Sequence, residues 1–174
     1  MNAVGSKTKG ERIRRETGGA VYVEFLIAFM PLFMTFMSIV QFGFLQIADI
    51  MTKHAAVTGV RAAVVVLPDD PANYSDAEPY RVVGQRKTDI ETAVKIPLLV
   101  VSPLPLPTVT FPTSAGGSDD QTTPFAHDAL VRVQVKFDYI CAVPLGREIV
   151  CGLTGIKTLK AEAALPMQGA NYVF

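Results

Sequence analysis

The chain has 174 residues, of which 49% are hydrophobic, enough for one modest soluble domain beside a membrane segment. Its 16 basic and 16 acidic residues cancel, but before Gly19 five basic residues accompany only two acidic ones. The remainder is slightly acidic and has no basic concentration, so the sequence predicts no nucleic-acid partner.

Residues 1–19 form a basic leader that ends in Gly18 and Gly19, and these small residues and Ala20 come before the apolar run. A secretory signal peptide has the opposite order, with the small residues after its apolar core. Cleavage after Gly19 would therefore remove the leader and leave the apolar helix on the mature protein.

The segment from Phe25 to Ala48 carries no charged residue. As a helix it would be about 36 Å long, against a hydrocarbon core of about 30 Å. We therefore predict a transmembrane helix over residues 20–50, whose cationic leader stays in the cytoplasm so that the chain after Ile50 is periplasmic. The alternative is a buried core helix, which would need a much larger protein around it.

Glu24 stands at the start of this apolar run, one helical turn after Ala20 and on the same face. A charged side chain at mid-helix costs about 2.5–3.5 kcal/mol, so it is normally retained for a purpose. An α-ammonium group created at Ala20 would give Glu24 a partner. The alternative is an interfacial acid favoured by the helix dipole.

Aromatic residues recur every three or four positions from Phe25 and form one stripe, which suits either subunit packing or contact with lipid. Pro31 cannot donate a hydrogen bond to the carbonyl of Ile27, so a kink is expected there. The stripe comprises Phe25, Phe29, Phe33 and Phe36.

The helical pattern continues beyond the membrane over residues 51–67, to about Leu67, where Pro68 and an acidic turn end it. Small side chains line one of its faces and would let another element approach closely. They are Ala48, Thr52, Ala55, Gly59 and Ala63.

Residues 68–174 are predicted to form a periplasmic α+β domain in which a small antiparallel sheet is covered by the long helix. A helix is expected over Arg81–Ile96, with Val82, Val83, Ile90 and Val94 apolar and Arg86, Lys87, Asp89 and Glu91 polar. Strands are expected at Thr108–Phe111, Ala129–Tyr139 and Ile156–Pro166, with a short helical turn after Pro144. The second strand alternates strictly, with Val131, Val133, Val135, Phe137 and Tyr139 on its core side.

Cys141 and Cys151 both fall in the periplasmic part, where a disulfide is expected to close a short loop and to contribute about 2–3 kcal/mol. Two buried free thiols are the alternative. The spacing does not match a C-x-x-C redox site, and only His54 and His127 could complete a metal set, so no metal is expected. No nucleophile elbow, phosphate-binding loop or dinucleotide fingerprint occurs, so neither an enzyme nor a cofactor is predicted.

Four sequence stretches resemble the TadE-like pseudopilins of the tight-adherence (Flp) type IV pilus system. These stretches are GGAVYVEFLIAFMPLFMTF, KHAAVTGVRAAVV, VRVQVKFDYICAVP and LKAEAALPMQGANY. The resemblance implies cleavage by a prepilin peptidase between Gly19 and Ala20 and assembly through Glu24, Phe25 and Pro31. Cleavage after Gly18 would place Glu24 sixth instead of fifth, so the family's spacing favours Gly19.

The resemblance also implies partners: the Flp major pilin, a TadF-like pseudopilin, the inner-membrane pilus platform and membrane lipid. The function it implies is a minor pilin subunit supporting pilus biogenesis and adhesion. Two alternatives are an uncleaved, single-span periplasmic protein that binds a ligand or envelope component, and a type II secretion pseudopilin. The latter generally has an aromatic residue or methionine where this chain has Ala20.

Overall fold

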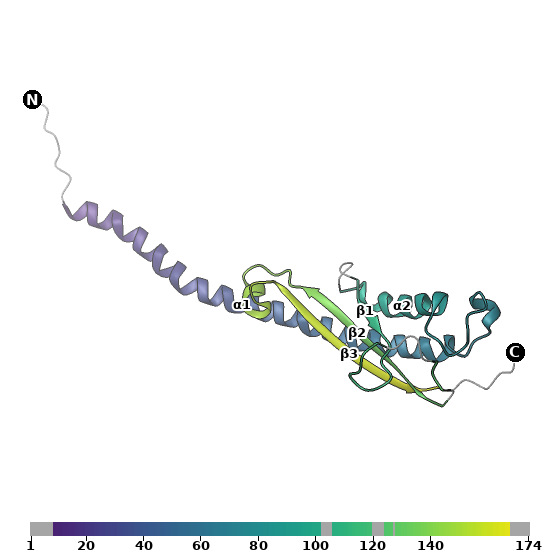
Figure 1. The fold of residues 1–174 in the computed structure, drawn as a ribbon. Helices are drawn as coiled ribbons and strands as arrows, with labels where there is room; N and C mark the ends of the chain where they lie inside the picture. Colours follow the sequence, from purple (N-terminus) through teal and green to yellow (C-terminus); the bar gives the residue numbers. More distant parts are fainter. Residues whose placement is uncertain (1–8, 102–105, 120–123, 127, 168–174) are drawn as a thin grey trace, which may run out of the picture.

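The computed structural model describes residues 9–101, 106–119, 124–126 and 128–167, with the backbone alone for 9–18. One very long helix extends away from a small α+β domain that is packed along its C-terminal half (Figure 1). The elements in chain order are α1 (Lys9–Val66), the 3-10 helix η1 (Pro71–Tyr74), α2 (Gly84–Leu98), β1 (Thr108–Thr110), β2 (Leu130–Ile140), α3 (Gly146–Cys151) and β3 (Ile156–Pro166).

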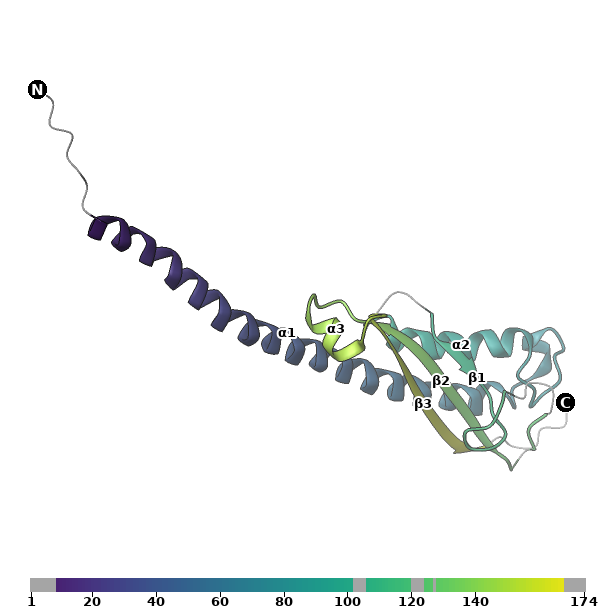
Figure 2. The same ribbon diagram turned by 60° about the vertical axis from the view of Figure 1, so that its left-hand side comes forward.

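Helix α1 is 58 residues long and ends at Val66, directly before Leu67 and Pro68, as the sequence predicted. It continues through Pro31, and its N-terminal half bends gradually away from the domain axis (Figure 2). The Thr35 hydroxyl donates to the Pro31 carbonyl at 2.8 Å, and the Ser38 hydroxyl donates to the Met34 carbonyl at 2.8 Å. Such bonds back to the preceding turn often accompany bending in helices.

The three strands form an antiparallel sheet in the order β1-β2-β3. The central strand places Val135 opposite both Val109 of β1 and Ala161 of β3. Its alternation is confirmed, because the five side chains predicted to face the core are buried. The predicted α+β fold, a long apolar helix packed on a small antiparallel sheet, is therefore the fold of this chain.

The small-residue face of α1 receives the rest of the domain. Ala48, Thr52, Ala55 and Ala63 are fully buried. At Gly59, an added Cβ would lie 2.4 Å from Val94 Cγ2 of α2 and 3.2 Å from Val133 Cγ1 of β2. The absence of a side chain at this position lets α2 and β2 approach the helix together.

The second helix differs from its predicted bounds and from its predicted polar face. It spans Gly84–Leu98 instead of 81–96, and Leu98, just past Pro97, is buried. Arg86, expected on the polar side, is fully buried: its guanidinium donates to the carbonyls of Val66, Leu67 (3.1 Å) and Asp69 (2.8 Å). The positive charge thus closes the C-terminal end of α1, where the helix leaves carbonyls without partners.

Candidate functional site

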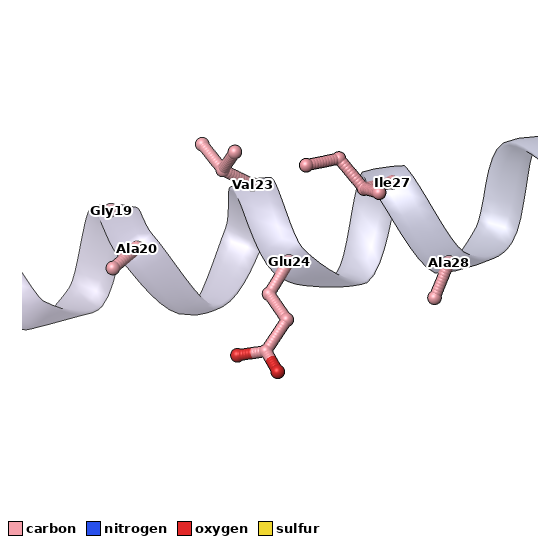
Figure 3. A pocket seen from close by; sticks show the side chains of 6 residues that line it. All are labelled: Gly19, Ala20, Val23, Glu24, Ile27 and Ala28. Atoms are coloured by element: carbon pink, nitrogen blue, oxygen red, sulfur yellow. The ribbon is translucent and has the colours of Figure 1, made fainter.

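The N-terminal segment predicted to carry the assembly residues is an exposed part of α1. Ala20, Glu24 and Ala28 project from one side of the helix, with Val23 and Ile27 on another (Figure 3). The Glu24 carboxylate is exposed, and none of the side chains that the structure describes forms a hydrogen bond or ion pair with it. The carboxylate is therefore accessible to a positive charge that this structure does not contain, such as one on another molecule.

The apolar half of α1 lies outside the domain. The helix is long and apolar enough to cross a membrane, and no residue of its most apolar stretch of 18 residues is buried within the structure. Large side chains are exposed along this half of the helix, among them Tyr22 (73% exposed) and Leu32 (70% exposed). The interpretation of this segment as a core helix therefore has no support from packing within the chain, because a core helix would be covered.

The predicted aromatic stripe is present and ordered along the helix. Phe25 and Phe29 stack with ring centroids 5.5 Å apart, and Phe29 and Phe33 stack at 5.6 Å. These distances are within the range of favourable aromatic pairs. Phe25, Phe29 and Phe36 are exposed, whereas Phe33 is half-buried.

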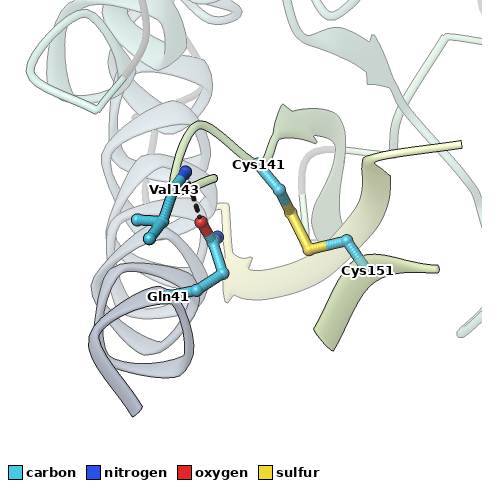
Figure 4. Close-up of a disulfide and its surroundings, with 4 residues drawn as sticks. All are labelled: Gln41, Cys141, Val143 and Cys151. Atoms are coloured by element: carbon cyan, nitrogen blue, oxygen red, sulfur yellow. Dashed lines mark hydrogen bonds between the residues drawn. A yellow bond between two sulfur atoms is a disulfide. The ribbon is translucent and has the colours of Figure 1, made fainter. Parts of the chain in front are cut away.

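The domain contacts α1 a second time, inside the segment assigned to the membrane. Residues 141–155, here called the disulfide loop, contain α3 and the Cys141–Cys151 disulfide, whose Cα atoms are 6.6 Å apart. The Val143 amide donates to Gln41 Oε1 at 3.0 Å, and Gln41 is fully buried by this contact (Figure 4). A Cβ on Gly146 would lie 2.4 Å from the Met37 carbonyl oxygen, so α3 meets the helix backbone at very close range.

Neither Gln41 nor Gly146 was identified from the sequence. Gln41 is an amide within a run defined only by its lack of charge, and its polarity was the available signal. A buried amide needs hydrogen-bond partners, and the partner found here is 102 positions away. No local sequence pattern connects residues that far apart, so the hydrogen bond between Val143 and Gln41 could not be predicted from the sequence.

Among the residues that the structure describes, no three His, Cys, Asp or Glu side chains form a group that could hold an ion. His54 lies on α1, whereas His127 is outside the described residues, as is the end of the stretch LKAEAALPMQGANY.

The fold defines a pilin-like protein: a long N-terminal apolar helix, exposed in its first half and packed in its second half on a three-stranded antiparallel sheet. Residues 19–61, about a quarter of the chain, match the family model of the TadE-like proteins, so over this segment the chain is similar to that family. The matched segment begins at the predicted cleavage site and covers Glu24, the apolar helix and most of the small-residue face. No curated protein and no solved structure matches the chain.

Proposed function

We propose that this protein is a minor pilin subunit (pseudopilin) of a tight-adherence pilus system, matured by a prepilin peptidase and assembled through the N-terminal half of α1. The observation that carries the proposal is the combination of a TadE-like segment at 19–61 with an exposed apolar stretch of helix that begins at Glu24, an acid that pairs with none of the described side chains. The partners would be the Flp major pilin, a TadF-like pseudopilin and the inner-membrane platform.

Cleavage between Gly19 and Ala20 would give the mature chain a positively charged end. On a straight helix Glu24 lies one turn from that end, so its own N-terminus and that of a neighbouring subunit are both candidates for pairing. In low-dielectric surroundings an ion pair is far stronger than in water, which would make Glu24 selective for a processed neighbour. The exposed apolar surface around Phe25 and Pro31 would then pack against the neighbouring helix.

The proposal also places the protein in the membrane before assembly. Residues 20–50 would cross the inner membrane, 51–67 would continue the helix outside it, and 68–174 would be periplasmic. The basic leader supports this orientation, since positively charged flanks favour the cytoplasmic side. The Cys141–Cys151 disulfide agrees with an oxidising compartment.

The test co-expresses the full chain with a prepilin peptidase and pilus components, and determines the N-terminal sequence and intact mass. The mature protein is expected to begin at Ala20. Gly19→Ser should block processing, whereas the control Gly18→Ser should leave it intact and so separate the two adjacent glycines. Glu24→Ala should be processed but fail to co-purify with pilus components.

Functional material that retains Met1 or Asn2 would contradict the proposal and favour an uncleaved, single-span periplasmic protein. Full assembly of Glu24→Ala would remove the proposed role of the carboxylate while leaving processing in place.

A further inference from the structure

The disulfide loop forms the end of the domain nearest to the apolar half of α1, in both views of the molecule (Figures 1 and 2). It connects β2 to β3 beyond the end of the strand pair where Ile140 faces Ile156. Its contacts with Met37 and Gln41 fix its level along the helix.

The predicted segment 20–50 is longer than a bilayer needs, so the hydrocarbon core ends before Ile50 and close to the level of this loop. A transmembrane helix needs about 20 residues, so a span that begins between Gly19 and Phe25 ends between about residues 39 and 45. The loop is therefore held beside the helix at the depth where hydrocarbon gives way to lipid headgroups.

The loop is unusually apolar for a surface segment of a periplasmic domain. Leu153 is 97% exposed and Ile149 is 62% exposed, while the disulfide and Gly146 are turned inward. Three further large aliphatic side chains at the same end of the domain are also bare: Ile140 (49%), Leu145 (39%) and Ile156 (48%). Exposed apolar side chains that cluster in this way mark an interaction surface rather than scattered surface residues.

Two cationic side chains lie beside this apolar cluster, a combination that suits a membrane–water interface. Arg147 and Lys157 are exposed within and just after the loop, and the Arg147 side chain lies against Gly155. Long cationic side chains at this depth reach lipid phosphates while their stems remain in the apolar region. Glu148 is the one acid in the loop, and it is also exposed.

We infer that the disulfide loop inserts its exposed aliphatic side chains, Leu153 foremost, into the outer leaflet of the membrane and so holds the domain at a fixed height above the bilayer. This inference rests on the proposed membrane-spanning state of α1. The occupant of the apolar surface is lipid because its level is set by the helix that crosses the bilayer. The Cys141–Cys151 disulfide holds the turn that carries these aliphatic side chains in place, so the turn needs no larger hydrophobic core of its own.

The chain contains no tryptophan, so a single introduced Trp reports its own surroundings. The full-length protein is reconstituted into phosphatidylcholine vesicles, with or without phosphatidylcholine brominated in the upper part of its acyl chains. Leu153→Trp is the test variant, and its full exposure means that the substitution leaves packing intact. Phe36→Trp (58% exposed) reports the span, and Val65→Trp (72% exposed), about 36 Å further along α1 than Gln41, is the matched control in water.

The inference predicts that brominated lipid lowers Leu153→Trp emission to about half, as expected for a side chain within roughly 5–10 Å of the headgroup–acyl boundary. Its emission should also shift to shorter wavelength, while Val65→Trp does neither. A Leu153→Trp spectrum like that of Val65→Trp overturns the inference, and so does a blue shift without quenching, which would mean that protein, such as a second copy of this chain, covers the side chain. If Phe36→Trp is also unquenched, the transmembrane assignment itself fails, which is a separate outcome.

Discussion

Arg86 is the residue on which the C-terminal end of α1 depends. It comes from α2, is fully buried, donates to three carbonyls at the end of α1 and lies with its guanidinium carbon 4.2 Å from the centre of the Tyr74 ring. Burial lowers the pKa of Arg86, but a guanidinium remains protonated throughout the ordinary pH range. The charge therefore stays available to the helix end whenever the domain is folded.

Arg86→Met is expected to reduce the free energy of unfolding by about 2–4 kcal/mol, because it removes the charge-assisted hydrogen bonds from Arg86 to three backbone carbonyls. Denaturant unfolding of the full chain in detergent micelles, followed by circular dichroism, measures the change. Arg86→Lys should recover part of the loss, since an ammonium retains the charge but not the fork of donors. The exposed Arg61→Met is the control and should shift stability by less than about 0.5 kcal/mol; equal losses in both variants would contradict the capping role.

At the scale of elements, the packing of α2 and β2 on α1 depends on the bare backbone of Gly59. An added methyl group would overlap Val94 at 2.4 Å, so Gly59→Ala should destabilise the fold by about 1–3 kcal/mol. Gly43 is the matched control on the same helix, because an added Cβ there meets no atom within 4 Å. Gly43→Ala should be neutral or stabilising by up to about 1 kcal/mol through helix propensity.

Thermal unfolding of the two glycine variants side by side gives the measurement. A Gly59→Ala protein as stable as Gly43→Ala would mean that the helices pack less closely than the structure shows.

Elements whose packing follows a local period were predictable from the sequence. The strict alternation of β2 identified its buried face, and the small side chains from Ala48 to Ala63 identified the contact face of α1. Arg86 was assigned to the wrong face because its partners, the carbonyls at the end of α1, lie 17 to 20 positions earlier in the chain. The periodicity of one helix depends on that helix alone, so it does not show that a side chain will donate to the backbone carbonyls at the end of another helix.

The candidate site divides in the same way. Glu24 and the aromatic stripe belong to a single helix, so their relative placement followed from helical geometry. The contact of the disulfide loop with Gln41 depends instead on how far the β2–β3 pair extends along α1. That distance is set by strand length and register, which no local motif encodes.

For the molecule as a whole, the consequence is that the domain is attached to α1 at two levels. The sheet and α2 cover the small-residue face between Ala48 and Ala63, and the disulfide loop grips the helix at Met37 and Gln41. The first attachment buries the core and determines stability. The second buries Gln41, Gly146 and the disulfide, and fixes the domain along the part of α1 that is proposed to enter the membrane.

Gly146→Ala separates these two attachments. Its methyl group would lie 2.4 Å from the Met37 carbonyl oxygen, an overlap that costs about 1–3 kcal/mol and that α3 relieves by moving off the helix. Hydrogen exchange at the Val143 amide, which donates to Gln41, should then accelerate roughly tenfold to hundredfold, because local opening requires less free energy. Amides of β2 should keep their protection, since the sheet still packs on the first attachment. Unchanged exchange at Val143, or equal acceleration throughout β2, would mean that the two contacts form one cooperative unit and that the loop cannot be released independently of the fold.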